Sequence, residues 1–308
     1  MTNRDFHDPR ATEQRNPRSE RIDVASSLEI VDIMNAEDAR VAGVVQGQRE
    51  QIARAIDLIV AAFKAGGRLV YVGAGTSGRL GVLDATECPP TFGVPPTMVT
   101  GVIAGGYPAL VKSAEGAEGD VNAGMAAMDT AQVTNRDVVV GIAASGTTPY
   151  VRAALGKAQT LGATTVLVTC AMPPKVLAET CDVIINPVVG PEVVTGSTRL
   201  KAGTATKLVL NTLSTGAMIR LGKVFGNLMV DLMALSAKLH DRGERIVMEV
   251  GGVSREEARQ AIERAKGSVK LAIVMARRKV DAAEARRLLE TADGFVRPVV
   301  GDPPPVGR

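Results

Sequence analysis

Five short apolar runs that alternate with helical segments are the feature that most constrains this fold. The runs cover residues 68–73, 98–103, 137–143, 164–170 and 183–189, and a helical segment such as 149–161 lies between several of them. Runs of this length are typical of strands buried on both faces. Their alternation with helices predicts an α/β fold, a parallel sheet flanked by helices. Ligands of such sheets bind at the carboxyl ends of the strands.

Helical patterns continue on both sides of the predicted sheet. Residues 26–63 carry apolar side chains at helical spacing, and residues 201–221 and 227–239 also have helical character. The chain is therefore predicted to have three parts: an N-terminal tail and helical arm over 1–48, the α/β domain over 49–240, and a C-terminal three-helix domain and tail over 241–308.

Capping signals support the C-terminal helices. Ser254 with Glu257, and Asp281 with Glu284, have the spacing of capping boxes. We expect about three short helices over residues 254–292.

The composition argues against several classes of protein. The chain has no Trp, three Tyr and five Phe, so aromatic platforms for single-stranded nucleic acid are scarce. Its net charge of +3 comes from interspersed charges. Residues 10–21 are basic, but Glu13 and Glu20 lie among them, which predicts a solvated arm. No apolar run approaches the roughly 18 residues of a membrane span. We expect neither nucleic-acid nor membrane binding.

Histidine and cysteine are both rare. The two histidines, His7 and His240, argue against a zinc site built from histidines and against a Ser-His-Asp triad. Acid–base chemistry would then fall to carboxylates, Lys, Tyr or Cys. The three cysteines lack metal-ligand spacing and fit a reducing cytoplasm.

A glycine-rich loop follows the first predicted strand. Residues 73–78, Gly-Ala-Gly-Thr-Ser-Gly, match the glycine spacing of a dinucleotide site, but the second strand ends in Ala-Gly-Gly with no acidic residue for a ribose. A P-loop is excluded because no Gly-Lys-Ser/Thr closes the loop. Backbone amides and the hydroxyls of Thr76 and Ser77, together with Gly75, suit a small phosphate. The alternative is a turn that merely connects strand and helix.

A second loop of the same kind follows the third predicted strand. Ser145, Gly146, Thr147 and Thr148 precede Pro149, which suits the first turn of a helix. Two such loops at the carboxyl ends of strands can surround a phosphate monoester with neutral donors, without arginine. We therefore expect a sugar phosphate as the small-molecule ligand.

Longer motifs carry a resemblance to a known family. Residues 72–93, which run from VGAGTSGRLG to TECPPTFG, and residues 190–207, GPEVVTGSTRLKAGTATK, resemble the N-acetylmuramic acid 6-phosphate etherases of the sugar isomerase (SIS) domain family. The second motif is shared with the glucokinase regulatory protein. TEQRNP at 12–17 and NLMVD at 227–231 also match, so the resemblance runs nearly end to end. It implies a SIS-type sheet and a small UBA-like C-terminal helical domain.

The resemblance also implies an activity. The family removes D-lactate from N-acetylmuramic acid 6-phosphate, giving N-acetylglucosamine 6-phosphate, in bacterial cell-wall (peptidoglycan) sugar recycling. It is a carbon–oxygen lyase family that works as homodimers and needs no cofactor or metal. Its two catalytic glutamates correspond to Glu87, in TECPP, and Glu118, in GAEG. Glu115 lies only three residues before Glu118 and is the alternative position for the second catalytic glutamate.

The roles of these residues stay open at the level of sequence. Cys88 and the two prolines after it suggest a partly apolar setting for Glu87, which favours Glu87 as proton donor and Glu118 as base, although the roles could be exchanged. Ser197 and Lys201, with Arg199 and Arg79, are candidates for holding the phosphate or the lactyl carboxylate. The alternatives for them are a helix start at a dimer contact and, for Arg79, a structural ion pair.

Two other functions remain in competition. An aldose–ketose isomerase of the SIS family also needs a base near carbon 2 of the sugar but needs no acid at the oxygen on carbon 3. A non-enzymatic regulator that senses a sugar phosphate is the second alternative.

Overall fold

The chain forms two compact units in a computed structural model that describes residues 10–232 and 237–305. The first unit contains residues 1–86 and 97–214, and the second contains residues 87–96 and 215–308. Two long helices, α4 (Gly75–Phe92) and α9 (Lys201–Arg220), contribute to both units. The boundaries of these two units differ from the domain limits predicted at residues 48 and 240. The predicted limits concern parts of the chain that fold separately, and they stay a prediction.

The first unit is built on a five-stranded parallel sheet, which confirms the predicted α/β fold. Its strands are β1 (Leu69–Gly73), β2 (Val99–Ile103), β3 (Val138–Ile142), β4 (Thr164–Val168) and β5 (Val183–Ile185). The strand order is β2-β1-β3-β4-β5. The chain runs from β1 to β2 on one side and returns to β3 on the other, so the order reverses at β1. Such a reversal is where open parallel sheets bind ligands.

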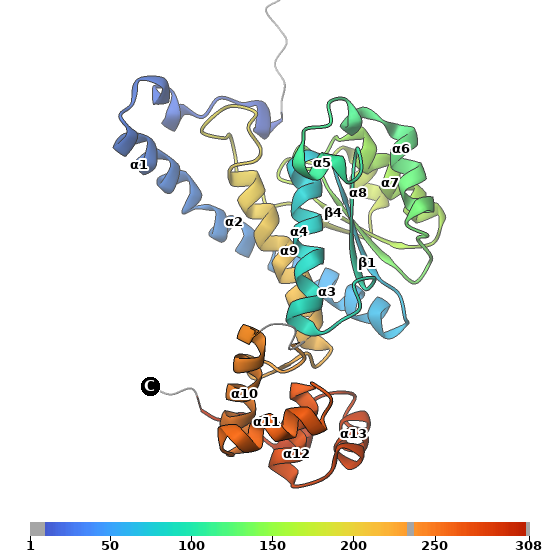
Figure 1. The fold of residues 1–308 in the computed structure, drawn as a ribbon. Helices are drawn as coiled ribbons and strands as arrows, with labels where there is room; N and C mark the ends of the chain where they lie inside the picture. Colours follow the sequence, from blue (N-terminus) through green and yellow to red (C-terminus); the bar gives the residue numbers. More distant parts are fainter. Residues whose placement is uncertain (1–9, 233–236, 306–308) are drawn as a thin grey trace, which may run out of the picture. The chain divides into compact units, whose positions relative to one another are not determined.

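Helices cover both faces of this sheet (Figure 1). On one face, Val70 and Val139 pack against Val151 and Leu155 of α7 (Pro149–Thr160). On the other face the Tyr71 hydroxyl lies 2.8 Å from an Asp84 carboxylate oxygen of α4. The remaining helices of this unit are α1 (Ser27–Asp38), α2 (Val41–Gln46), α3 (Arg49–Lys64), α5 (Pro108–Val111), α6 (Val121–Thr130), α7 (Pro149–Thr160) and α8 (Lys175–Thr180).

The N-terminal segment is anchored, so the prediction of a solvated arm is wrong for its described residues. It forms three 3₁₀ turns, η1 (Ala11–Glu13), η2 (Pro17–Ser19) and η3 (Ile22–Val24). Thr12 is 1% exposed, and its carbonyl accepts a hydrogen bond of 3.1 Å from the Gly196 amide. The Ser19 hydroxyl donates to the Val193 carbonyl at 2.8 Å. The segment is thus bonded, through one backbone carbonyl and one hydroxyl, to the backbone of residues 193 and 196. Residues 1–9 of the predicted tail lie outside the described residues.

The second unit is mainly helical. Its elements are β6 (Val224–Phe225), β7 (Leu228–Met229), α10 (Ala237–Gly251), α11 (Arg255–Arg264), α12 (Val269–Arg278), α13 (Ala282–Thr291) and α14 (Arg297–Val300). The three short helices expected over 254–292 are confirmed as α11, α12 and α13, and Ser254 with Glu257 forms a complete capping box.

The helix predicted over residues 227–239 is wrong in its first part. Residues 224–229 form an antiparallel hairpin in which β6 and β7 pair, and Gly226 turns the chain with a φ of +58°. Such a φ favours glycine, and a two-residue Gly-Asn turn is a hairpin signal that the helical pattern concealed. Helix α10 begins at Ala237, and residues 233–236 of the prediction lie outside the described residues.

Candidate active site

The two predicted phosphate loops follow neighbouring strands. β1 and β3 pair in parallel, with Gly73 opposite Ile142 at their carboxyl ends. The loop after β1 leads into α4, and the loop after β3 leads into α7, which begins with Pro149 as predicted. The two loops therefore start side by side at the reversal point of the sheet. The sequence could identify each loop, whereas only the pairing of β1 with β3 shows that the two loops begin next to each other.

Close packing of glycines sets the shape of the first loop. A Cβ atom on Gly78 would lie 2.7 Å from the Gly73 carbonyl oxygen and 2.6 Å from Ile103 Cγ1, so only glycine fits there. Gly75 turns the chain with a φ of +54°. Thr76 and Ser77 are half-buried in the first turn of α4. The amides and hydroxyls of a helix start suit a phosphate.

A cavity of ≈ 320 Å³ opens beside this loop, at the carboxyl ends of β1 and β2. Arg79 lines it, and the Nε atom of Arg79 donates to the Leu110 carbonyl at 3.1 Å. The cavity is lined by Ala74, Gly75, Arg79, Ala104, Ala109, Ser113, Ala114, Glu115, Gly116, Ala117 and Glu118. The first loop and a guanidinium thus share one cavity with two carboxylates.

Glu118 reaches this cavity from a short 3₁₀ turn, η4 (Ala117–Gly119). Gly116 precedes the turn with a φ of +76°, a left-handed conformation that favours glycine. Glu118 is exposed, as expected of a group that must meet substrate. Glu115 lines the same cavity, so the geometry keeps both carboxylates as candidates for the base.

Glu87 lies on α4, ten residues after Ser77. Its side chain is exposed, whereas the neighbouring Cys88 is 2% exposed. Adjacent helical residues point in different directions, so burial of the thiol does not extend to the carboxylate. The partly apolar setting expected for Glu87 therefore does not come from burial of its carboxylate and stays a prediction. Glu87 belongs to the second unit and Glu118 to the first.

A cation that the sequence did not predict contacts the second loop. Ser145 Oγ lies 3.0 Å from Thr147 Oγ1 and accepts from the Thr147 amide at 3.3 Å. Arg10 Nη1 donates to Thr147 Oγ1 at 3.2 Å. The expectation of neutral donors without arginine is thus incomplete. No local signal could reveal this contact, because Arg10 and Thr147 are 137 positions apart.

Lys201 has an internal partner. It is 2% exposed, and its ammonium group pairs with Glu37 of α1, which also accepts from Asn16 at 2.8 Å. Glu192 accepts from the backbone amides of Lys201 and Ala202 at 3.0 and 2.9 Å. Burial raises the pKa of Glu192, although these amides oppose the shift. The Lys201 ammonium and the first backbone amides of α9 therefore have hydrogen-bond partners within the protein.

Ser197 is half-buried in the turn that precedes α9, and its amide donates to the Val194 carbonyl at 3.0 Å. Arg199, in the same turn, is exposed. A Cβ atom on Gly203, in the first turn of α9, would lie 3.9 Å from Thr76 Cγ2 of the first loop. The start of α9 thus lies beside the phosphate loop. The substrate roles of Ser197 and Lys201 stay predictions.

Known proteins resemble this chain over nearly its whole length. It is 52% identical over 295 residues to the N-acetylmuramic acid 6-phosphate etherase of Edwardsiella ictaluri (strain 93-146), covering 96% of this chain and 98% of that protein. It is 52% identical over 292 residues to the etherase of Mesorhizobium japonicum, covering 95% of each chain. The chain belongs to the N-acetylmuramic acid 6-phosphate etherase family. This confirms the resemblance in the sequence motifs.

Two further similarities concern the α/β unit of this etherase-family chain. Residues 51–159 match the glucokinase regulatory protein N-terminal SIS domain. Among solved structures, the phosphoheptose isomerase of Neisseria gonorrhoeae is 18% identical, with a TM-score of 0.46, over 62% of this chain and 98% of that one.

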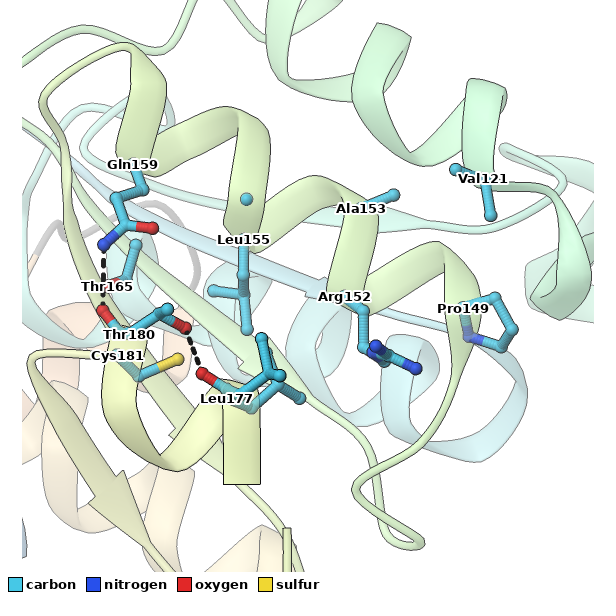
Figure 2. A pocket seen from close by; sticks show the side chains of 12 residues that line it. Val121, Pro149, Arg152, Ala153, Leu155, Gln159, Thr165, Leu177, Thr180 and Cys181 are labelled. Carbon is cyan, nitrogen blue, oxygen red and sulfur yellow. Dashed lines mark hydrogen bonds between the residues drawn. The ribbon is translucent and has the colours of Figure 1, made fainter. Parts of the chain in front are cut away.

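A second hollow, mostly apolar, lies between α7 and α8 and has a volume of ≈ 420 Å³ (Figure 2). None of the predicted catalytic or phosphate-binding side chains lines it. Cys181 lies at its wall, and burial raises the pKa of this thiol to about 11. A thiol with so high a pKa is a poor nucleophile at neutral pH, so this groove offers no catalytic group of that kind.

Residues 10–232 and 237–305 contain neither a cluster of metal-ligating side chains nor a helix that could cross a membrane. In this part of the chain, no three His, Cys, Asp or Glu side chains gather as metal ligands would. Likewise, none of the described helices has the length and apolar character needed to cross a membrane.

Proposed function

We propose that this protein cleaves the D-lactyl ether of N-acetylmuramic acid 6-phosphate, giving D-lactate and N-acetylglucosamine 6-phosphate. The observation that carries the proposal is about 50% identity to N-acetylmuramic acid 6-phosphate etherases over more than nine-tenths of the chain. The ≈ 320 Å³ cavity, lined by the first phosphate loop, Arg79 and Glu118, supports it independently.

The chemistry calls for an acid and a base. Opening of the sugar ring exposes an aldehyde at carbon 1, which acidifies the hydrogen on carbon 2. A base removes that proton, a double bond forms between carbons 2 and 3, and the carbon 3–oxygen bond breaks as an acid protonates the departing lactate oxygen. Water then adds its hydroxyl to carbon 3, and carbon 2 regains a proton. Two carboxyl groups in opposite protonation states can catalyse both the elimination of lactate and the addition of water.

We assign Glu118 as the base at carbon 2 and Glu87 as the proton donor to the lactyl oxygen. The position of Glu118 at the cavity supports the first assignment, since a base must reach the substrate. Exposure of Glu87 on α4 leaves its carboxylate accessible to substrate. The phosphate is assigned to the two loops, with Gly75, Thr76 and Ser77 on one side and Ser145, Gly146, Thr147 and Thr148 on the other.

The first experiment is incubation of the purified protein with N-acetylmuramic acid 6-phosphate, with D-lactate measured enzymatically. Lactate release at a rate proportional to enzyme concentration is expected. No lactate release, together with conversion of an aldose 6-phosphate that has a hydroxyl at carbon 2 into its ketose, would instead indicate an aldose–ketose isomerase. Binding of the sugar phosphate without any turnover would indicate a regulator.

The base is tested by exchange of the carbon 2 hydrogen with solvent deuterium. Glu118→Gln should abolish both exchange and lactate release, whereas Glu115→Gln should retain exchange. The reverse result would move the base to Glu115, which lines the same cavity. Wild-type exchange in both variants would place the base elsewhere.

We further propose that the protein is a cytoplasmic homodimer. Three exposed apolar side chains on one segment of the first unit, Val24 at 67%, Leu28 at 71% and Val31 at 51%, support a contact with a second copy. Leu28 and Val31 are three positions apart on α1 and share one face. Sedimentation should show a dimer that Leu28→Glu weakens; a wild-type monomer would contradict the proposal.

A further inference from the structure

The N-terminal segment brings a guanidinium to the second phosphate loop. Arg10 Nη1 donates to Thr147 Oγ1, which lies 3.0 Å from Ser145 Oγ. These two hydroxyls belong to the loop that follows β3, next to the loop that follows β1. A positive charge therefore stands among the neutral donors that we assign to the substrate.

The segment that carries Arg10 is held firmly at several points. Thr12, two residues on, is 1% exposed and is bonded through its carbonyl to the Gly196 amide at 3.1 Å. Asn16 is 4% exposed and donates to the Pro191 carbonyl at 3.1 Å and to Glu37 at 2.8 Å. Arg10 itself is half-buried. The backbone next to Arg10 is thus fixed by contacts that do not involve its own side chain.

The substrate of the proposed reaction carries two anionic groups, a phosphate and the lactyl carboxylate. Arg79 lines the ≈ 320 Å³ cavity on the β2 side of the first loop. Arg10 contacts the loop after β3, on the other side of β1. Guanidinium groups present N–H donors in a planar fork that matches both carboxylate and phosphate oxygens. A cation on each side of the first loop suits a ligand with two anionic groups.

We propose that Arg10 is a substrate-binding residue that, with Ser145 and Thr147, binds an anionic group of the sugar phosphate. This inference rests on the proposed function for the identity of the substrate. It adds a charged group to a loop, residues 145–148, whose own side chains are neutral. The N-terminal segment is then part of the active site, in addition to its hydrogen bonds with residues 191–196.

The test compares Arg10→Gln and Arg10→Lys with Arg15→Gln. Arg15 lies in the same segment, is exposed, and undergoes the same change of charge, so it is the matched control. Loss of a charge-assisted contact should raise the KM of Arg10→Gln roughly 10- to 100-fold with a smaller change in kcat. Arg10→Lys should recover part of the loss, and Arg15→Gln should behave as wild type.

The affinity for the product distinguishes the two anions. N-acetylglucosamine 6-phosphate keeps the phosphate and lacks the lactyl group. If Arg10 binds the phosphate, Arg10→Gln should weaken product binding, measured by calorimetry, by the same factor as KM rises. If Arg10 binds the carboxylate, product affinity should stay unchanged while KM rises.

Three results would overturn the inference. The first is an unchanged KM and product affinity in Arg10→Gln. The second is an equal effect in Arg15→Gln. The third is a fall in melting temperature, equal in the glutamine and lysine variants, that accounts for the lost activity, since this would make Arg10 purely structural. Absence of lactate release by the wild type would refute the proposed function instead, and the calorimetric comparison with the sugar phosphate would still test Arg10.

Discussion

The buried pair of Lys201 and Glu37 allows a quantitative test of whether Lys201 serves the fold or the substrate. The side chains are 3% and 2% exposed, and Glu37 also accepts from Arg18 and Asn16. Burial favours the neutral form of Glu37, but the hydrogen bonds of Lys201, Arg18 and Asn16 outweigh it, and its pKa is lowered. We therefore expect Glu37 to be charged at neutral pH.

The two single substitutions should lower the free energy of unfolding by different amounts. Glu37→Gln leaves the Lys201 ammonium buried without its carboxylate, which should destabilise by about 3–5 kcal/mol. Lys201→Met leaves Glu37 with Arg18 and Asn16, so the loss should be about 1.5–3 kcal/mol, near that of one charged hydrogen bond. The double variant should recover part of the loss of Glu37→Gln, because no buried ammonium remains.

The assay is thermal unfolding of the wild type and the three variants, followed by circular dichroism. For a unit of this size each kcal/mol changes Tm by roughly 2–4 °C, so Glu37→Gln should lower Tm by about 6–20 °C and Lys201→Met by about 3–12 °C. The substrate KM of Lys201→Met is measured alongside, at a temperature where the variant stays folded.

Lys201 also lines a cavity of ≈ 190 Å³ together with Arg18 and Arg40, which leaves a binding role to be tested. An unchanged Tm in both single variants, with a large rise in KM for Lys201→Met, would refute the structural role. Lys201 would then act on the substrate, as the sequence predicted.

Three further predictions concern other buried groups. Gly78→Ala should destabilise by about 1–3 kcal/mol and raise KM, because its methyl group would meet backbone at the phosphate loop; a neutral effect in thermal unfolding would contradict this packing. Burial favours a higher pKa for Asp137, but its contacts with Arg68 outweigh burial, and the folded pKa is lowered from 3.8. The ionised Asp137 thus contributes stability above about pH 4, and this contribution is lost as the pH falls through its folded pKa. Asp137→Asn should therefore lower Tm at pH 7 and weaken the dependence of Tm on pH below about pH 4. The same dependence of Tm on pH in wild type and variant would exclude this role of Asp137. Cys170 is buried and Cys181 is half-buried, and burial raises the pKa of Cys170 to about 12 and that of Cys181 to about 11. Both thiols should therefore react slowly with Ellman's reagent at pH 7.5 until urea unfolds the chain, and fast reaction of Cys170 in the native protein would argue against its burial.

The strands could be predicted from the sequence because their signal is local. Each begins within one residue of the predicted start, since a continuous apolar run marks where a buried strand begins, whereas β4 and β5 end at residues 168 and 185, before the predicted 170 and 189. The hairpin of residues 224–229 was missed because its two strands have two residues each, too few to show a period.

The candidate site was only partly predictable. The loop residues and Glu118 were named from motifs, and in the structure Glu118 lines the same cavity as Gly75 of the first loop. The partners of Lys201 and Thr147 were not predictable, because Glu37 lies 164 positions from Lys201 and Arg10 lies 137 from Thr147. Such contacts depend on how distant segments pack, which a local pattern does not record.

The sequence by itself determined the set of parts: parallel strands, two hydroxyl-rich loops, a chain with only two histidines, and membership of an etherase family. Only the tertiary structure decided that β1 and β3 are neighbours, which joins the two loops at one edge of the sheet. It also decided that Lys201 is buried against Glu37 and that the N-terminal segment carries Arg10 to Thr147. The physical reason is that residue type and spacing fix local conformation, whereas the charge and burial of a group depend on the residues that long-range packing brings to it.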